Sequence, residues 1–195
     1  MQSTIRLANR EDAAAIQSIY APIVTETAIS FELEPPSVEE MRRRIETTLQ
    51  TYPWLVCDER EVIGYAYGGL FRSRAAYQWT VEVSVYVHAD HRGKAVARAL
   101  YASLFDWLKV QGYATAVAGV VLPSPASMAL HKSLGFQQVG VFHRVGNKFG
   151  AWHDVVWWEL PLQELPDPAP APRALPEVVK SGEWPAPVTG AYSRK

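Results

Sequence analysis

Hydrophobic residues along the chain follow a helical period in some segments and a strand period in others. The helical spacing predicts helices over residues 12–24, 38–50, 95–111 and 124–134. Alternating or continuous apolar runs predict strands at 3–8, 77–87, 114–122, 136–145 and 152–160, with a hairpin over 53–70. This order predicts a mixed sheet flanked by helices, an α/β or α+β sandwich.

Polar residues mark the expected ends of these helices. Asn9 with Asp12, and Ser37 with Glu40, have the spacing of a capping box ahead of the first two helices. Gly112 stands where the third helix is expected to stop.

The composition changes after Leu162. Residues 163–195 are rich in Pro and Ala and show no periodicity, so we expect an extended tail behind one domain of residues 1–162. Trp184 is the residue through which this tail could pack on the domain. A disordered tail without a role is the alternative.

Bulk composition excludes several function classes. The chain has 195 residues, and 48% of them are apolar. Its net charge is −1, so electrostatic attraction does not favour nucleic acid or an anionic membrane as the main partner. No apolar run approaches the roughly 20 residues of a membrane span, and no secretory signal is visible. The single cysteine, Cys57, lies in an apolar run and predicts a buried, inert thiol. We expect a cytoplasmic protein.

The stretch "SVYVHADHRGKAVARALY", residues 84–101, joins a strand to a helix through a small, basic bend. Such a bend leaves backbone N–H groups free at a helix N-terminus, where an anion can bind. Arg92 and Lys94 add positive charge that suits a phosphate, although they are also compatible with a solvated surface pair.

Two residues carry candidate acid–base chemistry. Glu82 is a carboxylate in a strand that is otherwise apolar or neutral, just ahead of the bend. A solvent-facing residue on a half-exposed sheet is the simpler interpretation of it. His131 follows Ser127 by four residues, so the two share a helical face, and histidine exchanges a proton near neutral pH. A lone histidine on a helix is more often structural.

Taken together, these stretches resemble the GNAT acetyltransferases, which use acetyl-CoA. In that superfamily a Q/R-x-x-G-x-G/A bend binds the CoA pyrophosphate, and residues 92–97, "RGKAVA", match it here. A second signature ends in Y-x-x-x-G-F and corresponds to residues 131–136, with His in place of Tyr. "ISFELEPPS", "YPWLV", "RSRAAYQWTVEVSVYV", "LHKSLGF" and "VGNKFGAWHDVVWWEL" narrow the resemblance to the phosphinothricin acetyltransferase branch, over about residues 3–162.

The resemblance implies a GNAT-like, mostly antiparallel central sheet and direct acetyl transfer in a ternary complex, without an acyl-enzyme. The acceptor would be the α-amino group of phosphinothricin, methionine sulfoximine, methionine sulfone or a related amino acid. Glu82 is then the expected general base, and His131, at the position of the superfamily's Tyr, the expected proton donor to the CoA thiolate. A backbone N–H near Val85 would stabilise the oxyanion, and Cys57 would take no part.

The same resemblance implies the binding residues. The residues expected to bind acetyl-CoA are Val85, Tyr86, Val87, Arg92, Gly93, Lys94, Ala95, Val96, Ala97, Arg98, Ser124, Ser127 and His131. Those expected to bind the acceptor, beside Glu82, are Phe31, Arg72, Arg74 and Tyr77. The two arginines suit a carboxylate through paired N–H donors, but an exposed loop pair is the alternative. Phe31 and Tyr77 are equally compatible with an ordinary core.

Two departures from the family pattern bear on cosubstrate binding. Ala95 stands where the superfamily has its first loop glycine, so its methyl group would crowd the pyrophosphate or change the bend if that position needs a positive φ. Ser124 stands where the branch usually has Asn. Members of the branch bind substrate near a homodimer interface, which implies a homodimer here. No residue cluster has metal-ligand spacing, so no metal is expected.

Alternative functions remain open from the sequence. One is a GNAT enzyme that acetylates a protein N-terminus, a lysine or a polyamine, although Arg72 and Arg74 disfavour cationic acceptors. Another is a CoA-binding regulatory module without useful catalysis, which Ala95 favours and which the presence of Glu82 and His131 disfavours. A mixed-sheet scaffold whose bend binds nothing is disfavoured by the order of the motifs.

Overall fold

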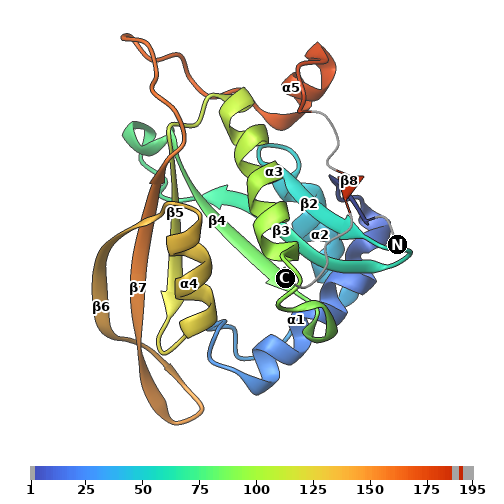
Figure 1. Cartoon of the computed structure of the whole chain (residues 1–195), viewed down its shortest axis with the longest axis vertical. Coiled ribbons are helices and arrows are strands. Elements are labelled where there is room, and N and C mark those ends of the chain that lie inside the picture. The colour runs from blue at the N-terminus through green and yellow to red at the C-terminus, as the bar shows by residue number, and fades with distance from the viewer. Residues whose placement is uncertain (1–2, 186–188, 191–195) are drawn as a thin grey trace.

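The computed structural model describes residues 3–185 and 189–190, which form a twisted sheet covered by helices (Figure 1). The strands are β1 (Ser3–Leu7), β2 (Trp54–Asp58), β3 (Val62–Leu70), β4 (Thr80–Val87), β5 (Thr115–Val121), β6 (Gln137–Lys148), β7 (Ala151–Pro161) and β8 (Thr189–Gly190). The α-helices are α1 (Ala13–Glu26), α2 (Val38–Thr48), α3 (Val96–Gln111), α4 (Pro125–Ser133) and α5 (Leu175–Ser181). Short 3-10 turns lie at η1 (Arg10–Asp12), η2 (Ala75–Tyr77) and η3 (Ala89–His91).

The described strands form one sheet in the order β6-β7-β5-β4-β3-β2-β1-β8. Within this described part, β4 and β5 run parallel and every other neighbouring pair is antiparallel. Because a parallel pair needs a crossover, α3 connects these two strands over one face of the sheet. The predicted mixed, mostly antiparallel sheet is confirmed.

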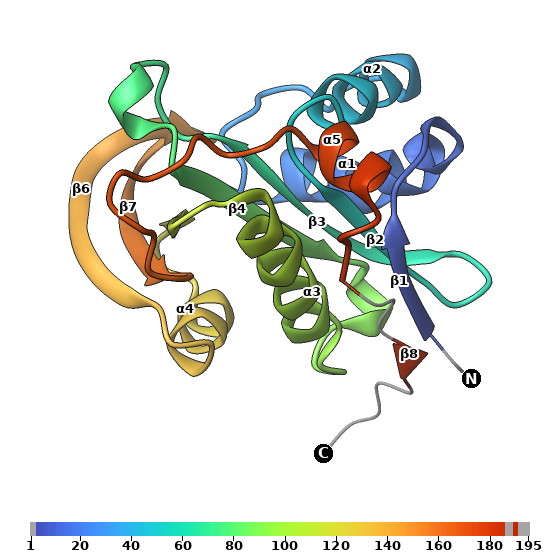
Figure 2. The ribbon, with the colours of Figure 1, turned by 90° about the horizontal axis from the view of Figure 1, so that it is seen from above.

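Helices cover both faces of the sheet. Figure 2 shows α1 and α2 on one side and α3 and α4 on the other. The larger buried cluster lies under α3, where Leu100, Leu104 and Leu108 pack on Val81 and Val83 of β4. A second cluster lies under α1 and α2. No helix in the described ranges is long and apolar enough to cross a bilayer.

The predicted elements are confirmed, with shifted ends in several places. The strand expected from residue 77 begins only at Thr80, because Ala75–Tyr77 close a 3-10 turn in which Tyr77 N donates to Arg74 O. β6 and β7 are longer than predicted, since residues 146–148 continue the ladder up to a tight turn at Phe149 and Gly150. The helix expected over 38–50 ends at Thr48.

The prediction of a wholly extended tail is wrong. Residues 175–181 form α5, and Leu175 and Val178 are buried in the core cluster beneath α3. Trp184, the expected anchor, is 48% exposed. The reason is that a helix this short buries only two apolar side chains, too few to produce a visible period in the sequence.

Candidate active site

The parallel strands β4 and β5 separate after a short stretch of pairing. Their register pairs Thr80 with Thr115, Val81 with Ala116 and Glu82 with Val117. Beyond this point β4 continues along β3 as far as Val87, whereas β5 continues along β7. The two strands therefore open into a wedge whose apex lies at Glu82, and among the described residues no strand pairs with the edge of β4 inside the wedge.

The backbone of β4 turns alternate residues toward this wedge. Tyr101 Oη donates to Val83 O at 3.5 Å, and Arg92 Nε donates to Val87 O at 3.3 Å. Because strand residues alternate in direction, Val85 presents its N–H and C=O to the same edge. An extended ligand in the wedge can therefore bond to the main chain of β4 between Val83 and Val87.

Glu82 lies on the sheet face that α1 and α2 cover, opposite the face of Val81 and Val83. Its neighbours on β3 include Gly69, directly opposite in the ladder, and Tyr67, one step further along that face. Burial raises the pKa of the Glu82 carboxyl above its ordinary value. A carboxylate with a raised pKa accepts a proton more readily than an exposed one, which suits a general base.

The bend after β4 adopts two left-handed backbone conformations. Gly93 has φ +73°, and Ala95, the N-cap of α3, has φ 61°. Position 95 therefore has the positive φ that the sequence left as a condition, and an alanine adopts it here. Ala95 makes no side-chain cap, so α3 starts with its first N–H groups free for an anion.

The charged residues of the bend have different surroundings. Arg92 bonds to the end of β4, as above, while Arg98 reaches across to α4, with Nη1 3.2 Å from Ser133 O and Nη2 2.5 Å from Ser133 Oγ. This contact joins the start of α3 to the end of α4. The Arg98 side chain is thus engaged, and its backbone N–H in the first turn of α3 is the group that faces an anion at the bend.

His131 lies on α4, buried between α4 and the sheet. Its Nδ1 is 2.8 Å from Ser127 O and 3.4 Å from Ser127 Oγ, which confirms that the two residues share a face. Its Nε2 is 3.5 Å from Tyr101 Oη. Since Nδ1–H donates to a carbonyl, Nε2 carries the lone pair, and burial lowers the pKa of the imidazole. In this state His131 is neutral and accepts at Nε2.

Ser124 precedes Pro125 at the start of α4, as predicted. It is the N-cap residue, but its hydroxyl makes no capping hydrogen bond. Together with Ser127, one turn further, it presents hydroxyl groups at the end of α4 that follows β5.

The predicted acceptor residues lie in two loops. Arg72, Arg74 and Tyr77 belong to the β3–β4 loop, residues 71–79, and the Arg72 guanidinium stacks over Phe71 at 4.9 Å and over Tyr77 at 5.8 Å. Phe31 belongs to the loop between α1 and α2. Both Phe31 and Tyr77 are 37% exposed, which is more than ordinary core aromatics show.

These two loops approach the same strand. Phe31 packs against Gly146 of β6 and lies 6.2 Å from the ring of His153 on β7, while Phe71 lies 6.1 Å from the ring of Trp157. His153 and Trp157 are four residues apart on one face of β7, a span of roughly 13 Å. The structure thus places Phe31 and the arginine loop beside the sheet face that carries Glu82, with the arginine loop at the end where β4 begins.

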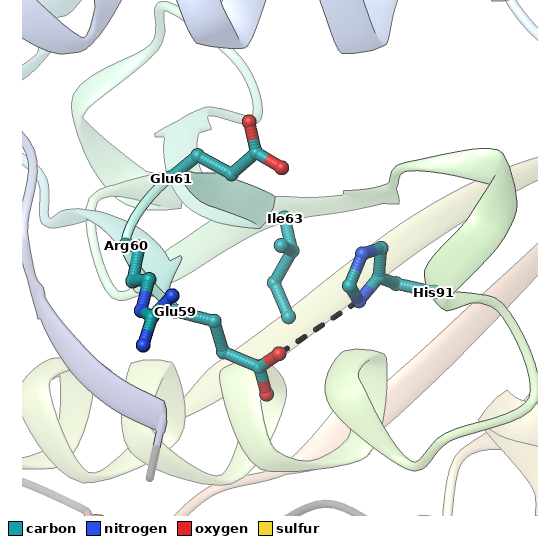
Figure 3. A pocket seen from close by; sticks show the side chains of 5 residues that line it. All are labelled: Glu59, Arg60, Glu61, Ile63 and His91. Atoms are coloured by element: carbon teal, nitrogen blue, oxygen red, sulfur yellow. Dashed lines mark ion pairs between the residues drawn. The ribbon is translucent and has the colours of Figure 1, made fainter. Parts of the chain in front are cut away.

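Other groups considered from the sequence lie outside this arrangement. Cys57 is fully buried, and burial raises the pKa of its thiol to about 12, which confirms an inert residue. In the described ranges no three His, Cys, Asp or Glu residues gather as metal ligands would. A cavity of about 320 Å³ lies at the β2–β3 turn, lined by Glu59, Arg60, Glu61, Ile63 and His91 (Figure 3). None of the predicted site residues lines it.

Comparison with known proteins agrees with this geometry. The model of the acetyltransferase (GNAT) domain family matches residues 5–157. The chain belongs to the GNAT acetyltransferase family. The L-amino acid N-acyltransferase MnaT of Escherichia coli is 40% identical, covering 85% of this chain and 97% of that protein. Phosphinothricin N-acetyltransferase of Streptomyces viridochromogenes is 35% identical, covering 89% and 95%. A GNAT superfamily phosphinothricin acetyltransferase from Sinorhizobium meliloti, solved with acetyl-CoA, has a TM-score of 0.80 at 38% identity, covering 84% of this chain and 90% of that one.

As a GNAT protein, the chain is an acetyl-CoA-dependent N-acetyltransferase. Sequence reasoning missed two residues at its site. Tyr101 joins the wedge to His131, and Lys148 holds the loop that carries Phe31. Both lie within stretches quoted above, but they make their contacts with backbone or ring atoms far away along the chain, so those stretches do not indicate what they contact. Tyr101 could have been found from its helical spacing, which places it on the face of α3 that continues from the bend.

Proposed function

We propose that the chain transfers the acetyl group of acetyl-CoA to the α-amino group of an amino acid or a close analogue, with phosphinothricin, methionine sulfoximine and methionine sulfone as the first candidates. The observation that carries this proposal is the position of Glu82, a half-buried carboxylate with a raised pKa at the apex of the wedge. The names of the relatives, among them phosphinothricin and L-methionine sulfoximine/L-methionine sulfone acetyltransferases, support the acceptor class.

In this proposal the wedge and the bend hold acetyl-CoA. The residues in contact with it are Val85, Tyr86, Val87, Arg92, Gly93, Lys94, Ala95, Val96, Ala97, Arg98, Ser124, Ser127 and His131. The free edge of β4 supplies main-chain hydrogen bonds, and the uncapped start of α3 supplies N–H groups for the pyrophosphate. The exposed Gly93, around which an added Cβ would meet nothing within 4 Å, leaves room for a phosphate to approach the backbone.

Glu82 acts as the general base, directly or through one water. It takes a proton from the acceptor ammonium, and the free amine then attacks the thioester carbonyl. The N–C bond forms, the C–S bond breaks, the CoA sulfur leaves as a thiolate, and the second proton of the attacking nitrogen is released to solvent as the amide forms. The Val85 N–H, turned toward the wedge, stabilises the oxyanion in between.

His131 supplies the hydrogen bond or proton that the thiolate needs. Its Nε2 carries a lone pair in the structure, so donation at this atom requires the imidazole to be protonated first. Tyr101, with its hydroxyl 3.5 Å from Nε2, is the neighbouring polar group. The role of His131 is therefore tied to pH, which gives it a direct test.

Arg72 and Arg74 bind the carboxylate of the acceptor, and Phe31 and Tyr77 wall its side chain. The support for this is their place on two exposed loops beside the Glu82 face. Their positive charge suits an anionic acceptor and disfavours a polyamine or a lysine side chain.

The active form is a homodimer in this proposal. The edge strand β6, the turn after it and the start of β7 expose Val139, Phe142, Val145, Phe149 and Trp152, each more than half exposed. An apolar strip on a sheet edge favours a second copy as its cover. Phe142→Glu is expected to yield a monomer in sedimentation, while a wild-type chain that sediments as a monomer contradicts the proposal.

The cytoplasm, where acetyl-CoA is available, is the proposed location, and residues 1–162 carry the catalytic fold.

Thiol release from acetyl-CoA, measured against a panel of acceptors, tests the function. The panel comprises phosphinothricin, methionine sulfoximine, methionine sulfone, plain amino acids, spermidine and a lysine peptide. Turnover confined to the amino acids and their analogues, with a raised acceptor KM in Arg72→Gln and Arg74→Gln, supports the proposal. Turnover only with spermidine or the peptide points to another acceptor class. If no acceptor gives thiol release while calorimetry still shows binding of acetyl-CoA, the result points to a regulatory module.

A further inference from the structure

The C-terminal segment from Gln163 to Ser181, which we term the strap, lies beyond the residues that the family model matches. It leaves the end of β7, passes the β3–β4 loop and ends in α5 (Figures 1 and 2). Gln163 Nε2 donates to Lys109 O at 2.8 Å and to Tyr113 O at 2.9 Å, which fixes the start of the strap to the end of α3.

The far end of the strap is fixed by buried groups. The Gln111 side chain is 1% exposed, and its Nε2 donates to Thr51 O at 2.7 Å and to Arg173 O at 2.8 Å. Arg173 N donates back to Gln111 O, and Leu175 N donates to Thr51 O. With Val178 fully buried under α3, the strap is part of the packed fold and not a loose extension.

Between these two anchors the strap contacts the acceptor loop. Trp79 Nε1 donates to Pro170 O at 2.7 Å. The main chain of the same residue is fixed by β5, because Trp79 O accepts from Ala114 N at 2.9 Å and from Thr115 N at 3.2 Å. Trp79 is the last residue of the loop that carries Arg72 and Arg74, so the strap holds this loop at the point where it enters β4.

We propose that the strap positions the acceptor-binding loop and that Trp79 is the positioning residue that connects them. The inference rests on the proposed function, in which Arg72 and Arg74 bind the acceptor carboxylate. These side chains are exposed, and ordering them around a small ligand costs conformational entropy. A fixed attachment at Trp79 lowers that cost, so the strap strengthens acceptor binding without touching the acceptor.

The test is the variant Trp79→Phe, which keeps an aromatic ring and removes the N–H donor. We expect the acceptor KM to rise about two- to tenfold, the range that one hydrogen bond supports. The acetyl-CoA KM and kcat should stay within twofold of the wild type, because the wedge and Glu82 are unchanged. Trp184→Phe is the matched control, since Trp184 follows α5 and is half exposed, and it should leave all three constants unchanged.

Hydrogen exchange gives a second readout. The amides of Tyr77 and Gln78, which donate to Arg74 O and Ala75 O, should exchange faster in Trp79→Phe, whereas amides of α3 should not. An unchanged acceptor KM together with unchanged exchange overturns the inference.

The arginine variants separate failure of the inference from failure of the proposed function. If Arg72→Gln and Arg74→Gln raise the acceptor KM while Trp79→Phe does not, the strap has no positioning role and the acceptor site stands. If the arginine variants leave the acceptor KM unchanged, the loop does not bind the acceptor, and the assignment of this site is wrong as well.

Discussion

The ammonium of Lys148 donates a hydrogen bond to the main-chain oxygen of Ser30 at 2.6 Å. It donates a second to Val24 O, at 2.7 Å, in the last turn of α1. The side chain is 2% exposed, so both bonds are shielded from water. Lys148 thereby joins the end of β6 to the loop that carries Phe31, and its charge also suits the C-terminal end of a helix.

Lys148→Met should therefore weaken both the fold and the acceptor site. Methionine fills a similar volume but leaves two buried carbonyls without a donor, which costs about 1–3 kcal/mol of unfolding free energy. Because the Phe31 loop is released, the acceptor KM should rise while the acetyl-CoA KM stays near the wild-type value. Denaturant unfolding and steady-state kinetics measure the two effects.

Lys148→Arg is the matched variant for this position, because it retains a positive donor. It should recover part of the acceptor affinity even where its larger head group costs stability. A loss of stability in Lys148→Met with no change in the acceptor KM would assign the residue to the fold alone.

Glu82→Gln tests the general base. The amide cannot accept the ammonium proton, so kcat should fall by about 10²-fold or more while acetyl-CoA binding measured by calorimetry stays unchanged. In the wild type, kcat should decline as the pH falls through the raised pKa of Glu82, above the ordinary glutamate value. The residual rate of the variant should not show this decline. A wild-type rate at saturating substrate contradicts the assignment.

The same substitution should raise stability near neutral pH. The pKa of Glu82 is higher in the folded chain than in the unfolded chain, so the folded state binds more protons between the two values. The unfolding free energy therefore drops as the pH rises through this window, and the wild type carries that loss at pH 7. Glu82→Gln has no carboxyl at this position and does not undergo this loss. Its unfolding free energy should therefore exceed that of the wild type at pH 7. The difference should vanish below about pH 4, which lies under the pKa of glutamate in the unfolded chain.

Local patterns were sufficient to predict much of the fold and part of the site. Alternation along 80–87 places Glu82 on the face opposite Val81, and Gly112 ends α3 with φ 97°, as its position indicates. The bend at 92–97 could be predicted because its function depends on small residues next to one another in the chain. These features need only neighbours in sequence.

The remaining features depend on partners that are distant in sequence. Lys148 meets Val24 across 124 positions, and Trp79 meets Pro170 across 91. In both contacts the acceptor is a backbone carbonyl, which every residue carries, so composition gives no sign of the pair. The splay of β4 from β5 likewise follows from which strands pair, and a single strand's pattern does not reveal it.

Ala95→Gly should stabilise the chain. The left-handed conformation at φ 61° costs a residue with a Cβ about 1–2 kcal/mol, a cost that glycine does not have. Part of this gain is offset by the greater freedom of glycine in the unfolded chain, so the net increase in unfolding free energy should be a few tenths to about 1 kcal/mol. Ala95→Val, with a branched side chain, should lose stability and acetyl-CoA affinity. Equal stability of the glycine and valine variants would show that position 95 is not strained.

His131→Asn tests the proton donor through its dependence on pH. Burial lowers the pKa of His131 below 6.5, and Nδ1–H already bonds to Ser127 O, so a proton reaches Nε2 only when the imidazole becomes charged. The ratio of wild-type to variant kcat should then be largest at low pH, up to about 10²-fold, and should decline as the pH rises. Effects of Glu82 cancel in this ratio because both proteins carry it. The unfolding free energy gives an independent check: with a lowered folded pKa, the wild type should lose stability as the pH falls through about 6.5, and the variant should lose less. If the ratio of the two kcat values stays flat between about pH 5.5 and 8.5, His131 only packs against Tyr101 and the wedge, and another group donates the proton to the thiolate.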